Sequence, residues 1–468
     1  MSVSPSSIYE KELTLLHKAV EQAEQKRKDL IISPIIIKIF DILEQFLRSK
    51  KLVCYGGTAI NNILPTKDQF YNKEIELPDY DFFTHNAIDD AKELADIYYS
   101  NGFDEVEAKA GVHVGTYKVF VNFIPIADIT QLPTNLFKAL QKNAIIVNGI
   151  YYAPPNYLRM AAYLELSRPD GDVSRWEKVW KRLNLLNKNY QIDQTQCNIR
   201  KLINDFNNIV LFKNKTINNI IINTVIKNGL IFFGIYALFA YSRYSTFKFP
   251  TSYFKQPFFD VLAINPANIA EQLKNNLEKA NITKINIIKH KGVGEIISDH
   301  YEIQVDKQPI IFIYEPLACH SYNETIINNK IVNIASIDTI LSFYLAFIYI
   351  NKPYYNTNRL LCMAQYLLIL QSNNRLKQKG ILKPFSTICY GKQHSLETIR
   401  AEKAFLYNEL KAKPCSKEYQ KYFLRYIPAQ PSECYKKNKK KTQKKKTQKK
   451  TQKKKNKKNN KKKKTNKH

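Results

Sequence analysis

Two segments of this 468-residue chain, 178 residues apart, share one pattern. LVCYGGTAI at 52–60 and LIFFGIYAL at 230–238 each begin with apolar residues typical of a buried strand. Each then reaches a glycine and continues into a stretch that favours a helix. Glycine occurs 13 times in the whole chain, so a glycine at the same point of both segments is a strong constraint on the fold.

Three further matches follow in the same order along the chain. They pair PDYDFFTHNAIDDAKEL (78–94) with PFFDVLAINPANIAEQL (257–273), FIPIADIT (123–130) with YEPLACHS (314–321), and IVN (146–148) with IVN (331–333). Four matches in one order predict a duplicated α/β unit. A generic alternation of strands and helices is the alternative explanation.

The alignment also indicates which copy can carry a charged site. Acidic and glycine residues of the first copy mostly fall on apolar or neutral residues of the second. The aligned pairs are Gly57 with Ile235, Asp79 with Phe258, Asp128 with Cys319, and Asp81 with Asp260, where the acid is kept. We therefore expect a functional first copy and a degenerate second copy that serves as a scaffold or binding surface.

The order of predicted elements favours a mixed α/β (α+β) fold. Helices are expected at 8–29, 34–49 and after the glycine pair, strands at 51–55 and 80–85, then a helix at 87–102 and a long or paired strand at 116–130. The expected organisation is an N-terminal helical segment (1–50), a catalytic domain (51–200), a degenerate domain with a helical extension (201–428) and a Lys-rich tail (429–468).

Asp79 and Asp81 are two residues apart in a predicted strand, so their carboxylates should project from the same face. Two such carboxylates repel each other unless a cation lies between them. Mg²⁺ suits this position, because it prefers carboxylate and phosphate oxygens. Asp128, at the end of another strand, would supply a third ligand.

The glycine pair complements these acids. Gly56 and Gly57 have no side chains to obstruct a phosphate, and the helix that follows offers its N-terminal amides to an anion. Thr58 adds a hydroxyl. A triphosphate held here, with three carboxylates holding two divalent ions, predicts a nucleotidyl-transfer site.

Bulk properties are compatible with that chemistry. The net charge is +31, and the 20 lysines after residue 435 leave +11 for residues 1–435, which indicates a polyanionic partner such as nucleic acid. Seven dispersed cysteines without metal-type spacing predict reduced thiols. The longest apolar run, 230–240, is too short to span a bilayer. We expect no membrane association.

These motifs carry a resemblance to a known family. CYGGTAINNILP (54–65), LPDYDFFT (77–84), IPIADIT (124–130) and LELSRPDGDVSRWEKVWKRLNLLN (164–187) resemble the poly(A) polymerase catalytic subunit of large cytoplasmic DNA viruses, within the nucleotidyltransferase superfamily. The likeness is strong over about residues 30–200 and looser beyond.

The resemblance implies template-independent extension of mRNA 3′ ends with AMP from ATP. It implies that Asp79 and Asp81 bind both Mg²⁺ (or Mn²⁺) ions, that Asp128 binds the ion that activates the 3′-hydroxyl, and that Gly56 and Gly57 hold the triphosphate. It also implies single-stranded RNA as a partner, and an inactive second domain. Thr58 stands where the superfamily commonly has serine.

Several alternatives stay open at this point. The enzyme could add uridylate or make oligoadenylate, and a sugar-nucleotide glycosyltransferase is a weaker alternative. A non-catalytic RNA-binding protein would not need Asp79 and Asp81. Among the cations of 167–183, none is preferred for phosphate; they are Arg168, Arg175, Lys178, Lys181 and Arg182.

The remaining expectations concern the tail, partners and location. The tail cannot bury apolar surface, so it is expected to be disordered and to retain RNA or aid solubility. A homodimer or a viral processivity partner is expected beside RNA. The expected location is the host cytoplasm, in the viral factory, with packaging in the virion as an alternative.

Overall fold

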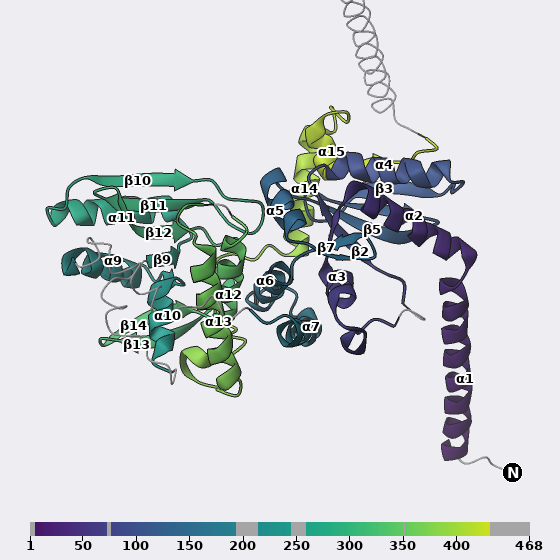
Figure 1. Ribbon diagram of the computed structural model, residues 1–468, viewed down its shortest axis with the longest axis horizontal. Helices are drawn as coiled ribbons and strands as arrows, with labels where there is room; N and C mark the ends of the chain where they lie inside the picture. The colour runs from purple at the N-terminus through teal and green to yellow at the C-terminus, as the bar shows by residue number, and fades with distance from the viewer. Residues whose placement is uncertain (1–4, 73–75, 193–213, 245–258, 351, 431–468) are drawn as a thin grey trace, which may run out of the picture. The chain divides into compact units, whose positions relative to one another are not determined.

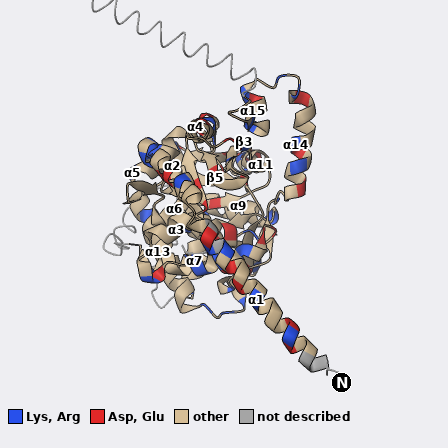
Figure 2. Ribbon diagram, turned by 90° about the vertical axis from the view of Figure 1, so that its right-hand side faces the viewer, with Lys and Arg blue, Asp and Glu red and all other residues tan. Residues whose placement is uncertain are grey.

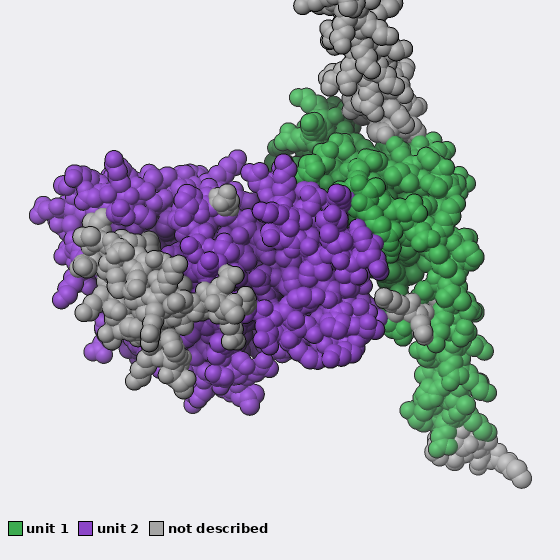
Figure 3. Space-filling model, viewed as in Figure 1, with its two compact units in different colours: residues 1–50, 72–131, 397–468 green, residues 51–71, 132–396 purple. Residues whose placement is uncertain are grey.

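The computed structural model describes residues 5–72, 76–192, 214–244, 259–350 and 352–430. The predicted tail, and Phe258 of the repeat alignment, lie outside these residues. Two compact units divide the chain, shown in different colours in Figure 3: Met1–Lys50, Asn72–Gln131 and Glu397–His468 form the first, and Lys51–Tyr71 and Leu132–Leu396 form the second. The four segments expected from the sequence, with their boundaries, stay a prediction.

The first part of the chain alternates helices and strands much as expected (Figure 1). Its helices are α1 (Pro5–Ile31), α2 (Pro34–Lys50), α3 (Gly56–Ile63), α4 (Ala87–Ser100), α5 (Thr134–Lys142), α6 (Pro155–Leu166) and α7 (Trp176–Asn189). Its strands are β1 (Val53–Tyr55), β2 (Tyr80–Thr84), β3 (Val106–Ala110), β4 (Thr116–Val121), β5 (Ile124–Gln131), β6 (Ile145–Val147) and β7 (Ile150–Tyr152).

The second part repeats this order. Its helices are α9 (Lys215–Lys227), α10 (Ile235–Ser242), α11 (Pro266–Lys279), α12 (Ile337–Phe347), α13 (Thr357–Asn373), α14 (Leu396–Leu410) and α15 (Lys417–Phe423). Its strands are β8 (Ile231–Phe232), β9 (Phe259–Leu262), β10 (Ile285–His290), β11 (His300–Val305), β12 (Gln308–Tyr314), β13 (His320–Ile327), β14 (Lys330–Ala335), β15 (Cys389–Tyr390) and β16 (Arg425–Tyr426). Short 3₁₀ turns complete the set at Thr66–Asp68, Val173–Arg175 and Gly380–Leu382.

Two eight-stranded sheets have matching strand orders. The first is β16-β3-β4-β5-β2-β1-β7-β6, and the second is β10-β11-β12-β9-β8-β14-β13-β15. Removing the extra edge strands β16 and β15 leaves seven strands that correspond one to one. Strands β2 and β5 pair in parallel, as do β9 and β12. The predicted duplication of an α/β unit is confirmed.

The two copies agree even in an irregularity. The β4–β5 hairpin has a bulge between Val119 and Phe120, and the β11–β12 hairpin has one between Ile303 and Gln304. A bulge inserts a residue and bends the strand, so it is a specific feature of a fold. Its recurrence at one place strengthens the correspondence of β5 with β12.

Two of the sequence matches were wrong. Asp81 lies opposite Asp128 in the β2–β5 register, and Asp260 lies opposite Phe312 in the β9–β12 register. The counterpart of Asp128 is therefore Phe312, and Cys319 lies beyond β12.

The IVN match is accidental, because its first copy ends β6 whereas its second lies in β14, the counterpart of β7. The loops between corresponding strands differ in length between the two copies, so a single sequence offset cannot align all of the strands.

The apolar run at 230–240 forms β8 and the start of α10, and most of its side chains are buried. None of the helices among the described residues combines the length and apolarity needed to cross a bilayer. Both basic and acidic residues occur along α1 and α14 in Figure 2.

Candidate active site

The carboxylates predicted to bind metal gather on the paired strands β2 and β5 of the first unit. Asp81 and Asp128 are register partners and are both half-buried. Asp79 is exposed and lies one residue before β2 begins. Sequence analysis therefore identified two acids, Asp81 and Asp128, that the sheet brings together. The third acid, Asp79, lies just before the start of β2.

Lys118 on β4 contacts this group. Its ammonium lies 2.5 Å from Oδ2 of Asp128, and the two residues are register partners in the β4–β5 hairpin. The Lys118 side chain is 37% exposed, so water screens the pair, which adds little to stability. Its position shows instead where a positive charge compensates Asp128.

The donor chemistry of these acids fits a hard divalent cation, which takes carboxylate oxygens. Within the described part of the chain, the one set of three ligands whose donor atoms all lie within 4.8 Å of one another is Asp170, Cys319 and Cys389. Since Cys319 and Cys389 are joined in a disulfide, that set lacks thiolates. The side chains of Asp79, Asp81 and Asp128 would have to turn inward to enclose an ion.

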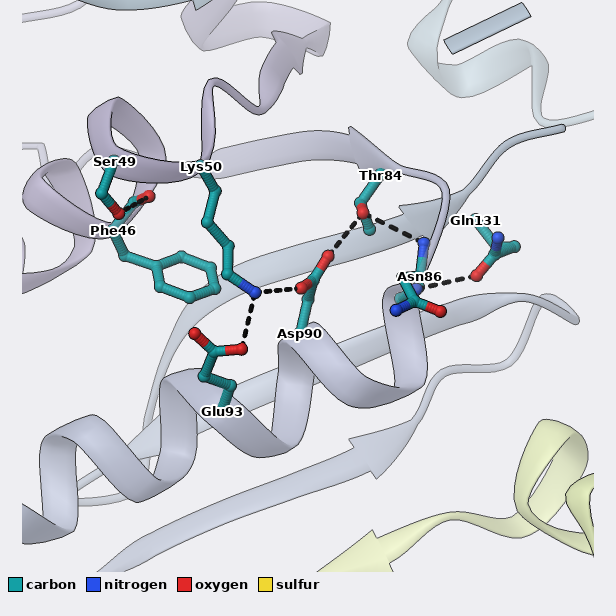
Figure 4. A network of polar contacts seen from close by, with 9 residues as sticks. Phe46, Ser49, Lys50, Thr84, Asn86, Asp90, Glu93 and Gln131 are labelled. Carbon is teal, nitrogen blue, oxygen red and sulfur yellow. Dashed lines mark hydrogen bonds and ion pairs between the residues drawn. The ribbon is translucent and has the colours of Figure 1, made fainter. Parts of the chain in front are cut away.

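A polar network at the opposite end of β2 fixes the strand (Figure 4). The Thr84 hydroxyl donates a hydrogen bond of 2.5 Å to the buried Asp90 of α4, and Lys50 at the end of α2 pairs with Asp90 and, at 2.6 Å, with Glu93. Burial alone would lower the pKa of Lys50, but the hydrogen bonds from Lys50 to Asp90 and Glu93 outweigh it and the pKa is raised. Gln131 ties the end of β5 to the start of α4 by accepting from the Ala87 amide at 2.7 Å.

The glycine turn belongs to the second unit. Gly56 has a φ of 74°, a conformation that favours glycine, and α3 begins at this residue, two positions before the predicted start. Thr58 is 4% exposed, so it offers little surface to a ligand. The prediction that this turn lies beside the carboxylates stays a prediction.

Arg182 of α7 lies against Gly57. A Cβ added to Gly57 would lie 2.8 Å and 2.9 Å from the two terminal guanidinium nitrogens of Arg182, and would collide with the Tyr71 hydroxyl. The absence of a side chain at Gly57 is thus what lets a cation approach the turn. A positive charge beside helix N-terminal amides is suited to bind phosphate.

Three residues hold Arg182 in place. Its guanidinium donates a hydrogen bond of 2.7 Å to the Tyr71 hydroxyl and lies 5.0 Å from the centre of the Phe70 ring. The buried side chain of Asn61 accepts from the backbone amides of Phe70 and Tyr71 at 2.8 Å and 3.0 Å. Asn61 on α3 therefore fixes the loop that contains Phe70 and Tyr71, and these two residues position Arg182.

Sequence reasoning had not singled out Arg182 from the neighbouring cations. Arg175 pairs with Glu165 at 3.1 Å, and Lys181 pairs with Glu177 at 2.5 Å. Both acids lie close in sequence, so an inspection of i to i+4 partners would have set Lys181 aside. The contact of Arg182 with Tyr71, 111 residues away, left no such local signal.

The second copy keeps the scaffold and loses the charge pattern. The half-buried Asp260 lies opposite Phe312, and a Cβ on Gly234 would collide with its carboxylate. Burial raises the pKa of Asp260 to about 7, although Arg359 acts in the opposite direction. Asp260 therefore lies beside the turn of its own copy, with Phe312 at the register position that Asp128 occupies in the first copy.

The prediction of reduced thiols was wrong. Cys319 and Cys389 form a disulfide between the start of β13 and β15, 70 residues apart. Cys362 and Cys415 each take part in a disulfide as well. Cys54 is free and buried. Folding brought together cysteines whose spacing carried no recognisable motif.

Comparisons with known proteins agree with this arrangement. Residues 41–172 match the family model described as "Poly(A) polymerase catalytic subunit". A protein of African swine fever virus (strain Badajoz 1971 Vero-adapted), described as "Putative poly(A) polymerase catalytic subunit", is 36% identical over 158 residues, which is 32% of this chain and 33% of the relative. One of Acanthamoeba polyphaga mimivirus with the same description is 31% identical over 180 residues, 37% of this chain and 30% of the relative.

These alignments span about a third of the length of the curated relatives. A solved structure extends the likeness in fold: Megavirus polyadenylate synthase matches with a TM-score of 0.72 at 20% identity, over 95% of this chain and 90% of that one. The predicted mixed α/β fold with a second copy of the same unit is thereby confirmed. The resemblance found in the motifs is confirmed as well, since residues 41–172 of this chain match the poly(A) polymerase catalytic subunit family and are similar to relatives with that description.

Proposed function

We propose that this chain is a polynucleotide adenylyltransferase that adds AMP from ATP to the 3′-hydroxyl of RNA without a template. The observation that carries the proposal is the register pairing of Asp81 with Asp128 inside the segment that matches the poly(A) polymerase family. Relatives with that description share the same segment.

The site would form where the glycine turn meets the carboxylates. Support comes from the second copy, in which both parts lie in one unit. There the carboxylate of Asp260 lies directly against Gly234. Since β2 corresponds to β9 and β1 to β8, we expect Asp81 to approach Gly56 in the same way.

Asp79 and Asp81 would hold two divalent ions, and Asp128 the one nearest the RNA 3′-hydroxyl. The chemistry that Mg²⁺ or Mn²⁺ supplies at such a site is a lowered pKa for the attacking hydroxyl and charge compensation for the departing pyrophosphate. Lys118 would then leave Asp128 and turn toward solvent or phosphate.

The turn and Arg182 would bind the triphosphate. Gly56 and Gly57 expose the backbone amides of α3, and the guanidinium of Arg182 beside them can donate two parallel hydrogen bonds to phosphate oxygens. Asn61, Tyr71 and Phe70 would hold that guanidinium so that little ordering is needed on binding.

The test is extension of a 5′-labelled oligoribonucleotide with each of the four nucleoside triphosphates, in Mg²⁺ and in EDTA. A ladder with ATP and divalent ion alone is the expected result. Extension with UTP instead would favour the terminal uridylyltransferase alternative. RNA binding without extension, unaffected by Asp79→Ala and Asp81→Ala, would favour a non-catalytic RNA-binding protein.

We also propose the substrates, the protein partner and the location that were expected from the sequence. RNA 3′ ends and ATP are the substrates, a homodimer or viral processivity partner is the protein partner, and the host cytoplasm is the location. Light scattering of the purified chain with and without RNA tests the dimer, and a monomer mass in both would exclude it.

A further inference from the structure

A cavity of about 570 Å³ lies in the second unit among the helices α6, α7 and α13. Its volume is in the range of small-molecule sites. Among the residues that line it are Arg159, Trp180, Asn184, Gln365, Ile369 and Arg375. Helix α12 packs against both α6 and α13, and α6 packs against α7 (Figure 1).

This cavity lies on the other face of α7 from the glycine turn. With about 100° per residue, Arg182 is roughly 160° away from Trp180 and Asn184 around the helix. Arg182 contacts the turn at Gly57, whereas Trp180 and Asn184 line the cavity. One helix therefore separates two sites, and the cavity is not the triphosphate site proposed above.

The floor of the cavity carries a buried positive charge. Arg159 is 1% exposed, and its side chain donates to neutral acceptors: Asn187 at 2.7 Å, Asn156, and the backbone oxygen of Tyr190. Among the described residues it forms no ion pair. A buried guanidinium without an acid is costly, and an anionic ligand would lower that cost. Arg375, which is exposed at the rim, adds a second cation.

The wall carries an unsatisfied acceptor. Gln365 lines the cavity and is 8% exposed; its Oε1 is buried and has no hydrogen-bond partner among the described residues, so a rotation of the amide toward the cavity would let a ligand N–H group reach it. Leaving a buried amide oxygen unpaired costs free energy that a ligand N–H group would recover. The site thus calls for a ligand that has both an N–H donor and a negative charge.

The remaining lining residues favour a ligand that contains a flat ring. The indole of Trp180 is half-exposed, and its ring meets Phe385 edge-on at 5.2 Å between centroids. Ile192, Leu368 and Ile369 supply apolar surface. Base stacking on such a ring stabilises nucleic-acid complexes and tolerates any base, because every base has a flat π-face.

We propose that this cavity is a second nucleotide site, which binds a nucleoside monophosphate unit whose base carries an exocyclic amino group. The amino group donates to Gln365, the base lies against Trp180, and the phosphate is attracted by Arg159 and Arg375. The choice of adenine rests on the proposed function. The unit is either free AMP or ATP, or an internal residue of the adenylate tail.

The experiment uses the full chain with Trp176→Phe, so that Trp180 is the one remaining tryptophan of the two. Its fluorescence is titrated with AMP, IMP and oligo(A) in EDTA, where the proposed catalytic site lacks its ions. We expect quenching by AMP, and about tenfold weaker binding of IMP, which has the same shape without the amino group. Tighter binding of oligo(A) than of AMP assigns the site to RNA, and the reverse assigns it to the free nucleotide.

Matched variants locate the binding. Gln365→Met and Arg375→Ala should each weaken AMP binding about tenfold, whereas Lys377→Ala, an exposed cation two residues further on, should change it less than twofold. Asp81→Asn should leave it unchanged, so an inactive enzyme that still binds AMP would refute the proposed function and not this site. No quenching at millimolar AMP, equal affinity for AMP and IMP, or full binding by both the Gln365→Met and Arg375→Ala variants would overturn the proposal.

Discussion

The two copies of the α/β unit differ most at their glycine turns. In the first copy a cation, Arg182, lies against the turn, while in the second copy an acid, Asp260, does. The proposed function places Asp81, the counterpart of Asp260, beside the first turn as well, so the copies differ in the added cation: Arg182 lies against Gly57, whereas the nearest side-chain atoms at Gly234 all belong to Asp260. The comparison teaches that a cation held beside the turn distinguishes the copy proposed to bind a triphosphate.

The strand that follows shows the same contrast. Asp81 faces another acid, Asp128, on the next strand, and both are partly exposed to water. Asp260 faces Phe312, among buried rings such as Tyr314. The carboxylates proposed to bind a cation, Asp81 and Asp128, stay in contact with water, whereas a lone acid among aromatic rings is driven toward its neutral form.

The largest expected effect tests whether the first copy alone carries out AMP transfer. Asp81→Asn should lower the rate of AMP transfer on the order of 10²–10³-fold, since it removes a charge that acts at the reacting phosphate. The matched change Asp260→Asn should alter the rate less than twofold. Initial rates of primer extension measure both, and equal losses in the two variants would contradict the assignment of the first copy as catalytic.

The next effect concerns the disulfide found in the second copy. Replacing Cys319 and Cys389 by serine should lower the free energy of unfolding by about 3 kcal/mol, because the bridge closes a long loop of 70 residues in the unfolded chain. Urea denaturation of the oxidised protein and of the double variant measures the difference. Identical midpoints would mean that the bridge does not form in solution.

A smaller expected effect is a change of stability with pH that depends on Asp260 of the second copy. Because the pKa of Asp260 is raised to about 7, the folded protein binds this proton more tightly than the unfolded chain does. The stability that it contributes is complete below pH 3.8 and is lost as the pH rises through 7. Asp260→Asn should therefore gain about 2 kcal/mol relative to the wild type between pH 5 and pH 8.

Thermal or urea unfolding at the two pH values measures this gain, with Asp338→Asn as a comparison, since burial also raises the pKa of Asp338, to about 6. A gain for Asp260→Asn that does not depend on pH would show that the carboxylate is already ionised in the folded protein.

The smallest effect sharpens the role of the turn. Arg182→Met should raise the KM for ATP about tenfold, roughly 1.4 kcal/mol, with little change in stability. Its neighbour Lys181, which is exposed and paired with Glu177, is the control, and Lys181→Met should leave the KM unchanged. If both variants behave alike, Arg182 acts through general surface charge.

The sequence allowed the fold class, the duplication and the acidic strands to be predicted, because strands and helices repeat and Asp81 keeps its place as Asp260. It did not identify the counterpart of Asp128, since loops of unequal length shift the later strands. It also did not identify Arg182 or the Cys319–Cys389 bridge. Their partners lie 111 and 70 residues away, and contacts at such distances depend on the folded chain.

The short strand β16 has a consequence for how the protein is made. It adds to the edge of the first sheet beside β3, where the Leu424 carbonyl accepts from the Ala110 amide at 2.9 Å and Arg425 pairs with Glu107 at 2.9 Å. The strands of the second copy, β8 to β15, all leave the ribosome before β16, so the β3 edge of the first sheet is paired only after every strand of the second sheet has been synthesised.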